Sequence, residues 1–226
     1  IKFYYDEISY EINKFTEKNL ISIIHLGKMR GVDLSRLTIS PFSYNPIENE
    51  LKVITNLTVR ISYSNIVDIS DKYYSPDFNS LYKKCINYIP PSTKDIITTY
   101  PVKYIIVSDP AYQTALQPLV DWKTRKGFEV IQAYINDPVV GNTNTSIKSF
   151  IQSFYDNASV NDPAPTYLLL VGDIDQVPSF QASGHVSDMY YCEFDGNGDF
   201  YPEMYYGRFS ASSVADIEVQ VAKTLT

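Results

Sequence analysis

The segment DGNGDFYPE at residues 195–203 has the residue types and spacing of a metal-binding loop. Asp195, Asn197 and Asp199 alternate with two glycines, and glycine permits the positive φ angles of a tight loop. Side-chain oxygens at every second position can then converge on one cation. Calcium takes about six to eight oxygen ligands in flexible geometry. The segment therefore predicts a calcium site, although D-G and N-G are also common hairpin turns and the segment alone leaves both readings open.

The carboxylate of Glu203 and the main-chain carbonyl of Tyr201 are positioned in the sequence to complete such a site. The loop is not an EF-hand. An EF-hand has glycine at its sixth position and glutamate at its twelfth, whereas this segment has Phe200 and Tyr206 there. A calcium site here would need a geometry of its own.

A fourth carboxylate, Asp173, follows the apolar run of LLLVGDIDQVP at residues 168–178. In open α/β sheets, ligands collect outside the carboxyl ends of the strands. Asp173 is thus a candidate to position a loop, to serve a site or to assist the calcium ligands. The alternative is that Asp173 accepts hydrogen bonds from the main chain of the next turn.

Thiol chemistry has few candidates, because the chain has two cysteines, Cys85 and Cys192, and two histidines, His25 and His185. A thiol nucleophile needs an imidazole within reach. We interpret His185 as a loop residue and Cys192 as a small apolar residue, so we predict no catalytic residue in this chain. The spacing of the cysteines matches no metal or redox motif, and a disulfide between them stays open.

These candidate residues fall in a region, 101–226, that alternates between strand and helix patterns. Continuous apolar runs are typical of strands buried on both faces, and apolar residues at helical spacing separate them. We predict a mainly parallel sheet with right-handed crossovers, flanked by helices. The predicted strands are Val102–Val107, Phe128–Tyr134, Tyr167–Val171 and Met204–Phe209. The predicted helices are an amphipathic run that follows Asp109–Pro110 and ends at Lys126, the segment Thr143–Asp156, and one capped by Ser212.

Residues 1–65 have the alternating pattern of antiparallel strands instead. We predict strands at Leu20–Leu26, Leu34–Tyr44 and Leu51–Tyr63, the last two forming a hairpin around NPIENE. Residues 66–100 are interpreted as an exposed linker with one helical turn at Phe78–Ile86. Proteolytic processing is expected in this linker, near Lys83, Lys84 or Lys94.

Composition excludes some classes of partner. The formal net charge of −7 argues against nucleic acid, because no basic block is available to neutralise phosphates. No stretch reaches the roughly 18 apolar residues of a transmembrane helix. The chain starts and stops inside patterned segments, so we expect it to be part of a longer protein.

Four blocks of the chain resemble the gingipain family of cysteine peptidases, in the order of that family. They are GKMRGVDLSRLTISPFSYNPIENELKVITNLTVRISY (27–63), VDWKTRKGFEV (120–130), YLLLVGDIDQVP (167–178), and SDMYY (187–191) with DGNGDFYPEMYYGRFSASS (195–213). The last block is the most specific.

The resemblance implies a caspase-like α/β domain at 101–226, preceded by a β-rich inhibitory prodomain at 1–65 that packs on its own catalytic domain. It also implies bound calcium, protein or peptide substrates, and secretion or attachment at the outer membrane or cell surface. The catalytic histidine and cysteine of the family fall beyond Thr226, so this chain alone is expected to be inactive.

Two alternatives to a secreted cysteine endopeptidase stay open at this stage. The chain could belong to a non-catalytic relative that uses the caspase-like fold as a scaffold, or to a processing peptidase of the secretion apparatus. The sequence after Thr226 discriminates between them, because a peptidase needs a histidine and a cysteine there.

Overall fold

The computed structural model describes residues 6–16, 18–62, 72–88, 100–182, 184–196 and 198–226. The chain divides into two compact units. The first unit is Ile1–Leu26 with Asp33–Val67, and the second is Gly27–Val32 with Asp68–Thr226. A short stretch at 27–32 therefore belongs to the second unit although its neighbours in sequence belong to the first.

The first unit, together with the stretch at 27–32, contains one short helix and four antiparallel strands in its described part. Helix α1 (Glu7–Tyr10) is followed by four strands that form two two-stranded sheets: β1 (Ile21–Met29) with β2 (Val32–Ile39), and β3 (Phe42–Asn45) with β4 (Glu50–Val53). The predicted hairpin around residues 45–50 is confirmed. Its second strand is shorter than the predicted Leu51–Tyr63, because β4 pairs with β3 alone and Val53 lies opposite Phe42, where β3 begins.

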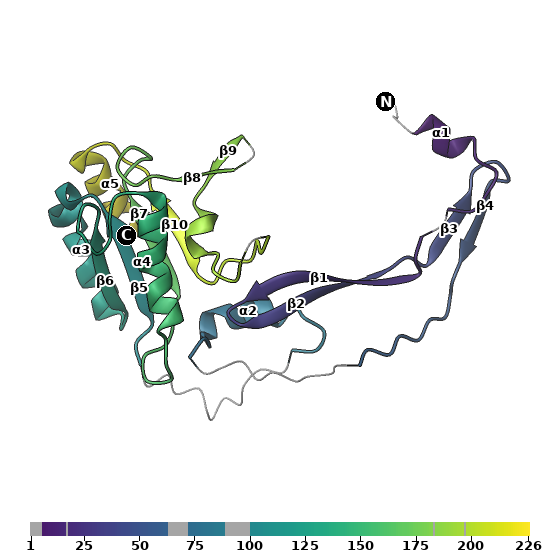
Figure 1. Cartoon of the computed structure of the whole chain (residues 1–226), viewed down its shortest axis with the longest axis horizontal. Coiled ribbons are helices and arrows are strands. Elements are labelled where there is room, and N and C mark those ends of the chain that lie inside the picture. The colour runs from purple at the N-terminus through teal and green to yellow at the C-terminus, as the bar shows by residue number, and fades with distance from the viewer. Residues whose placement is uncertain (1–5, 17, 63–71, 89–99, 183, 197) are drawn as a thin grey trace. The chain divides into compact units, whose positions relative to one another are not determined.

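The second unit contains the predicted parallel sheet, with strand order β10-β7-β5-β6 (Figure 1). All three strand pairs are parallel. The apolar runs predicted these strands within one or two residues. Their bounds are β5 (Lys103–Ser108), β6 (Glu129–Tyr134), β7 (Tyr167–Val171) and β10 (Tyr205–Phe209).

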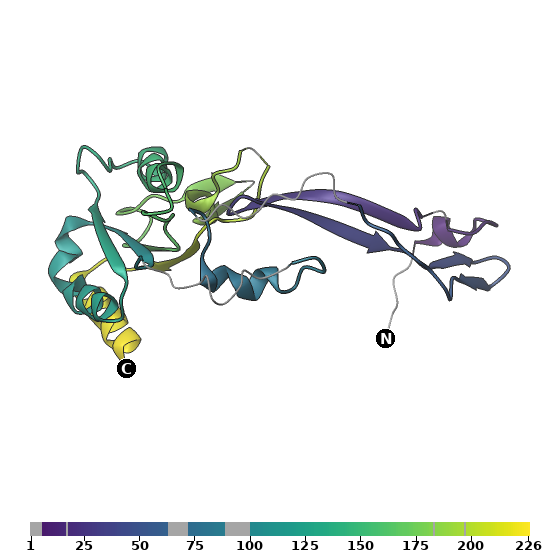
Figure 2. The ribbon, with the colours of Figure 1, turned by 90° about the horizontal axis from the view of Figure 1, so that it is seen from below.

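Helices cover both faces of this sheet: α4 (Asn144–Asp156) lies on one face, and α3 (Gln113–Arg125) and α5 (Val214–Leu225) lie on the other (Figure 2). Successive residues of a strand point to opposite faces. Accordingly, Ile105 of β5 packs in the cluster of α4, whereas Ile106 packs in the cluster of α3 and α5. Burial on both faces explains why the strands have no polar alternation.

Local signals fix the helix ends. Gly127 follows α3 with φ of 91°, a conformation that glycine adopts without strain, and Thr143 caps α4 through the N–H of Ser146. The predicted cap of α5 was wrong by one position. Ser213, rather than Ser212, accepts the N–H of Asp216 at 3.3 Å, because Ser213 is the residue with extended φ and ψ before the first helical turn.

Residues 72–88 differ from the predicted exposed linker. They form η1 (Pro76–Phe78) and α2 (Asn79–Tyr82), and the side chains of Phe78 and Tyr82 are each 2% exposed. The N–H of Ala164 donates to the carbonyl of Lys72 at 2.8 Å. Aromatic side chains thus hold this segment inside the second unit. Lys83 and Lys84 are exposed at the end of α2, while Lys94 lies outside the described residues.

Between β7 and β10 the chain forms β8 (Phe180–Ala182), β9 (His185–Ser187) and η3 (Met189–Cys192), and η2 (Pro110–Tyr112) leads from β5 into α3. The segment between β7 and β10 contains the candidate site residues. Within the described ranges, none of the helices has the length and apolar character that crossing a membrane requires.

A substitution at Leu170 would test whether this side chain lies in the hydrophobic core. Its side chain is 0% exposed in β7, where it lies between Val107 and Arg208 in the neighbouring strands. We expect Leu170→Ala to lower the free energy of unfolding by about 2–5 kcal/mol, because it leaves a cavity in a packed interior. Denaturant titration measures this, with Val219→Ala as the control because Val219 is 52% exposed on α5. Equal effects of the two variants would contradict the assigned core.

Candidate functional site

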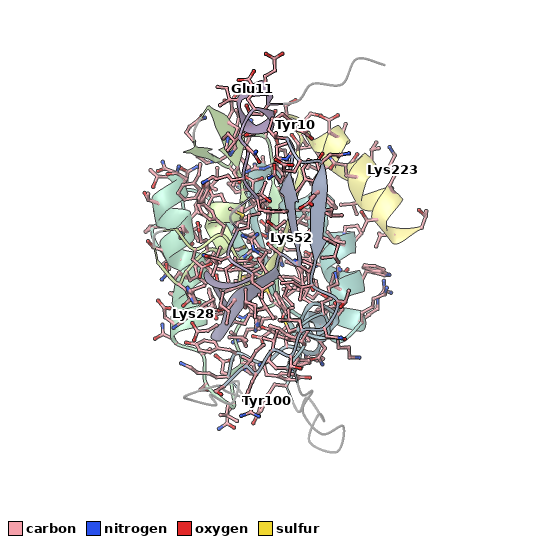
Figure 3. The ribbon with its side chains drawn as sticks, turned by 90° about the vertical axis from the view of Figure 1, so that its right-hand side faces the viewer. Tyr10, Glu11, Lys28, Lys52, Tyr100 and Lys223 are labelled. Carbon is pink, nitrogen blue, oxygen red and sulfur yellow. The ribbon has the colours of Figure 1, made fainter. Side chains whose placement is uncertain are left out.

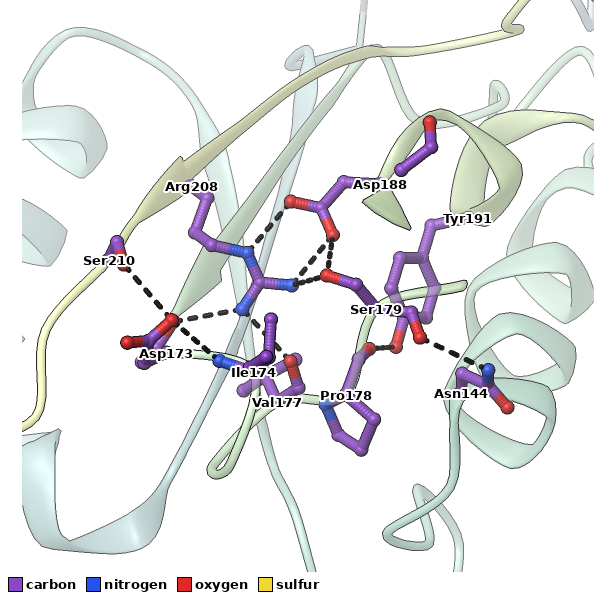
Figure 4. A network of polar contacts seen from close by, with 12 residues as sticks. Asn144, Asp173, Ile174, Val177, Pro178, Ser179, Asp188, Tyr191, Arg208 and Ser210 are labelled. Atoms are coloured by element: carbon purple, nitrogen blue, oxygen red, sulfur yellow. Dashed lines mark hydrogen bonds and ion pairs between the residues drawn. The ribbon is translucent and has the colours of Figure 1, made fainter. Parts of the chain in front are cut away.

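Arg208 on β10 joins the chain segments at the carboxyl ends of β7 and β10 (Figure 4). Its Nε and one terminal nitrogen each donate to the carboxylate of Asp188 at 2.7 Å. Its other terminal nitrogen donates to the carbonyls of Gly172 at 2.8 Å and Val177 at 2.9 Å. One guanidinium therefore fixes the end of β7, the following loop and the start of η3 against one another.

Asp188 is the acidic partner in this arrangement and also accepts a hydrogen bond from Ser179 at 2.6 Å. Burial on its own raises the pKa of Asp188, but the hydrogen bonds from Arg208 and Ser179 outweigh it and lower that pKa below its ordinary value. The pair is therefore charged at neutral pH. A bidentate pair of this kind imposes a fixed geometry on the segments that it joins.

The structure places Asp173 in this region rather than with the other predicted metal ligands. Its carboxylate accepts the N–H of Ile174 at 2.8 Å and the hydroxyl of Ser210 at 3.3 Å. These contacts match the alternative in which Asp173 organises the following turn. Asp173 is not a member of the carboxylate cluster that the described residues form.

The loop at residues 193–204 is closed at its ends by a main-chain hydrogen bond from the N–H of Glu203 to the carbonyl of Cys192, at 2.8 Å. Gly196 and Gly198 have φ angles of 109° and 86°, the left-handed conformations expected for a tight loop. In its described part, this segment forms no strand pair. It is a closed loop rather than the alternative hairpin.

Three of the predicted ligands meet in this loop. One carboxylate oxygen each of Asp195, Asp199 and Glu203 lies within 4.8 Å of the others, and we call these three residues the acidic cluster. Asp199 is held by two main-chain donors, the N–H of Tyr201 at 3.0 Å and the N–H of Lys28 at 2.8 Å. Asn197, the remaining predicted ligand of the loop, lies outside the described residues.

Glu203 has an unusual environment for a carboxylate, because it is 0% exposed. One oxygen accepts the N–H of Phe194 at 3.0 Å, and the other has no hydrogen-bond partner among the described residues. Burial, assisted by the charges of Asp195 and Asp199, raises the pKa of Glu203 to about 8. A buried carboxylate oxygen without a donor is costly, so this oxygen needs either a proton or a cation.

The cluster fits a hard cation on these grounds. Two oxygens that each lie about 2.4 Å from one calcium ion are at most about 4.8 Å apart, and the cluster meets that limit. A group of three carboxylates also suits calcium rather than a soft metal, which prefers sulfur and nitrogen. Asp195 is exposed, so water has access to complete the coordination.

The cysteines and histidines form no catalytic pair among the described residues. Cys192 is 0% exposed, and burial, followed by the nearby charge of Glu203, raises the pKa of its thiol well above the ordinary value. His185 is exposed on β9. Both cysteines are free thiols, which resolves the open question of a disulfide. A buried, protonated thiol is a poor nucleophile.

Sequence reasoning missed the hairpin tip at residues 27–32, which lies in the second unit. Arg30 is 1% exposed, and the Lys28 main chain bonds Asp199 of the acidic cluster. One signal was present in the sequence. A two-residue turn between strands favours Asn-Gly, whereas this turn has Arg30 and Gly31, with φ angles of 51° and 77°.

Two family models match the chain in sequence order. The model of the C25 propeptide matches residues 1–85, and the model of peptidase family C25 matches residues 97–226. The boundary between the two matches falls in the segment where processing was predicted.

Proteins that are similar to this chain include gingipains, and a similar solved structure is that of a protease. Lys-gingipain of Porphyromonas gingivalis is 33% identical over 238 residues, which cover 100% of this chain and 13% of that protein. Gingipain R1 of Porphyromonas gingivalis is 28% identical, covering 96% of this chain and 22% of that protein. A solved structure described as "Structure of Protease" matches 55% of this chain and 28% of its own, with 37% identity and a TM-score of 0.52. The chain thus spans a small part of the curated relatives that it matches.

Glu203 predicts a pH dependence of stability in chelator-treated protein. Its pKa is about 8 in the folded chain and about 4.3 in an unfolded one, so the folded state binds more protons between these values. The free energy of unfolding should therefore fall as pH rises from about 4.3 through 8. We expect Glu203→Gln to remove this contribution in denaturant titrations at pH 6 and pH 8.5. Glu218→Gln, on an exposed position of α5, is the control and should keep the pH dependence.

Proposed function

The chain belongs to peptidase family C25, and we propose that it comprises the end of the propeptide and the first part of the catalytic domain of a cysteine endopeptidase. The observation that carries this proposal is the joint packing of the two matched regions. Residues 27–32 and 72–85 of the propeptide match lie in the same compact unit as the peptidase match. A propeptide that packs on its catalytic domain is the arrangement of a latent peptidase.

The nucleophile and its base are proposed to come from residues that follow Thr226 in the longer protein. Cysteine catalysis needs a thiolate, a base that forms it and donors for the oxyanion. Cys192 is buried with a raised pKa, and Cys85 lies in the propeptide match. Neither cysteine of this chain meets the requirement.

The contribution of this chain to the proposed activity is a rigid frame. Parallel sheets build their sites at the carboxyl ends of the strands, and this is where Arg208 ties the ends of β7 and β10 to Asp188. We propose that this arrangement supports one wall of a cleft for protein or peptide substrates. We also propose secretion or attachment at the cell surface, which the resemblance to the gingipain family implies and which fractionation of the producing cells would test.

We propose that calcium binds the acidic cluster and has a structural role. Support comes from the orphaned oxygen of Glu203 and from the separation of the three carboxylates. When bound, the ion would neutralise these carboxylates and hold the loop at residues 193–204 closed against β10. Asp199 and Glu203 would supply buried ligands, and Asp195 an exposed one.

Calcium is expected to stabilise the folded protein. At about 100 times its dissociation constant it adds about 2.7 kcal/mol, which raises the melting temperature by about 5–10 °C in a protein of this size. Asp195→Asn should abolish most of this rise, while Asp173→Asn, which changes another exposed carboxylate outside the cluster, should leave it unchanged. Absence of calcium binding by titration calorimetry to a protein extended past Thr226 would refute the site.

The activity prediction compares the 226-residue chain with a protein extended past Thr226. With calcium and a reductant present, the chain should hydrolyse no member of a peptide library, and the longer protein should hydrolyse peptides in a way that thiol reagents abolish. Cys192→Ala in the longer protein should keep the activity, since this thiol serves packing. Turnover by the 226-residue chain that disappears in Cys192→Ala would show that the active site lies in this chain.

A further inference from the structure

Arg30 occupies a socket made of main-chain carbonyls. Its Nε donates to the carbonyl of Tyr73 at 2.6 Å, and one terminal nitrogen donates to Pro165 at 2.8 Å and Glu203 at 2.6 Å. The other terminal nitrogen donates to Ala164 at 3.3 Å. All three nitrogens of the guanidinium therefore donate, to four main-chain carbonyls in total, which suits its planar arrangement of donors.

Aromatic rings complete the socket. The guanidinium carbon lies 5.1 Å from the centre of the Phe78 ring and 6.0 Å from that of Tyr155, distances at which a cation is attracted to the ring face. Arg30 is 1% exposed, and among the described residues it takes part in no ion pair. Carbonyl dipoles and ring faces are therefore the groups in direct contact with its charge.

The main chain of the tip shows that the site is built for this side chain. Arg30 has φ of 51°, a conformation that residues other than glycine and asparagine rarely adopt. Such a conformation persists only where the surroundings enforce it. Further contacts fix the tip at the two residues before Arg30. The hydroxyl of Tyr82 donates to the carbonyl of Met29 at 3.0 Å, and the N–H of Lys28 donates to Asp199. The Lys28 side chain itself is exposed (Figure 3).

The socket has two halves that differ in origin. Tyr73 and Phe78, like Arg30 itself, belong to the propeptide match, whereas Tyr155, Ala164, Pro165 and Glu203 belong to the peptidase match. The hydrogen bonds of Arg30 to the second half therefore connect the two regions directly. A cut in the chain between residues 85 and 97 would leave all of them in place.

We propose that Arg30 is the anchor that retains the propeptide on the peptidase segment after the connecting chain has been cut, through a socket that accepts a guanidinium and rejects an ammonium. The proposal rests on the proposed division into propeptide and catalytic domain. It adds the residue that maintains the association. If the propeptide left, the carbonyls of Ala164, Pro165 and Glu203 would become accessible, and a competing ligand would bind them through a guanidinium group.

The test distinguishes the effect of the Arg30 guanidinium on association from the effect of its positive charge and from that of the turn conformation. A recognition sequence for a site-specific endoprotease replaces residues 90–95 of the chain, the chain is cut there, and size-exclusion chromatography reports whether the two pieces elute together. Arg30→Lys keeps the charge but loses the fork. Arg30→Asn relieves the backbone at φ of 51° but loses the cation. Arg36→Ala removes an exposed arginine of β2 and is the matched control.

The unsubstituted pieces and the Arg36→Ala pieces should elute together. Arg30→Lys and Arg30→Asn should each weaken the association by about 100-fold or more, the typical loss when a buried charged anchor is replaced. Thermal unfolding of the uncut variants verifies that each is folded before the cut. Retention of the pieces in Arg30→Lys would show that charge alone suffices, retention in Arg30→Asn would place the anchor elsewhere, and separation of the unsubstituted pieces would overturn the proposal.

The readout is association and involves no peptidase activity. If the longer protein is inactive but the cut pieces stay associated, the proposed function is contradicted and the anchor is not. If the longer protein is active but the cut pieces separate, the anchor is contradicted and the proposed function is not.

Discussion

The burial of Glu203 is the constraint on which most of the second unit's polar structure depends. Its N–H bonds the carbonyl of Cys192, its carbonyl accepts from Arg30, and its carboxylate accepts from Phe194. One residue thereby closes the loop at 193–204, receives the hairpin tip and supplies the innermost carboxylate of the acidic cluster. Displacing it would therefore disturb all three features.

Positive and negative charge are compensated by different means around this residue. The cation of Arg30 is stabilised by carbonyl dipoles and aromatic faces. The carboxylates of Asp199 and Glu203 accept from main-chain N–H groups instead, and one oxygen of Glu203 has no donor among the described residues. At the other end of β10, Arg208 and Asp188 neutralise each other directly. Arg208 and Asp188 need no further charge, whereas the orphaned oxygen of Glu203 needs either a proton or a cation.

The sheet could be predicted from the sequence because its signals are local. Continuous apolar runs marked β5, β6, β7 and β10, and helical spacing marked α3 and α4. Alternation of oxygen-bearing residues with glycine marked Asp195 and Asp199 of the acidic cluster for the same reason. What escaped prediction is long-range: Arg30 and Glu203 are 173 positions apart, and no pattern near either one indicates the other. The packing of residues 72–88 was missed because aromatic residues at irregular spacing resemble a linker until their partners are known.

The backbone of Arg30 also bears on the order in which the protein folds. An isolated hairpin has little reason to hold arginine in a left-handed turn, since the compensating carbonyls of Ala164, Pro165 and Glu203 are 134 to 173 positions away. Those carbonyls are in place only after β7 and β10 have joined the sheet. Because contacts that are distant in sequence tend to form late, we expect the tip to dock after the sheet has formed and not to act as a template for it.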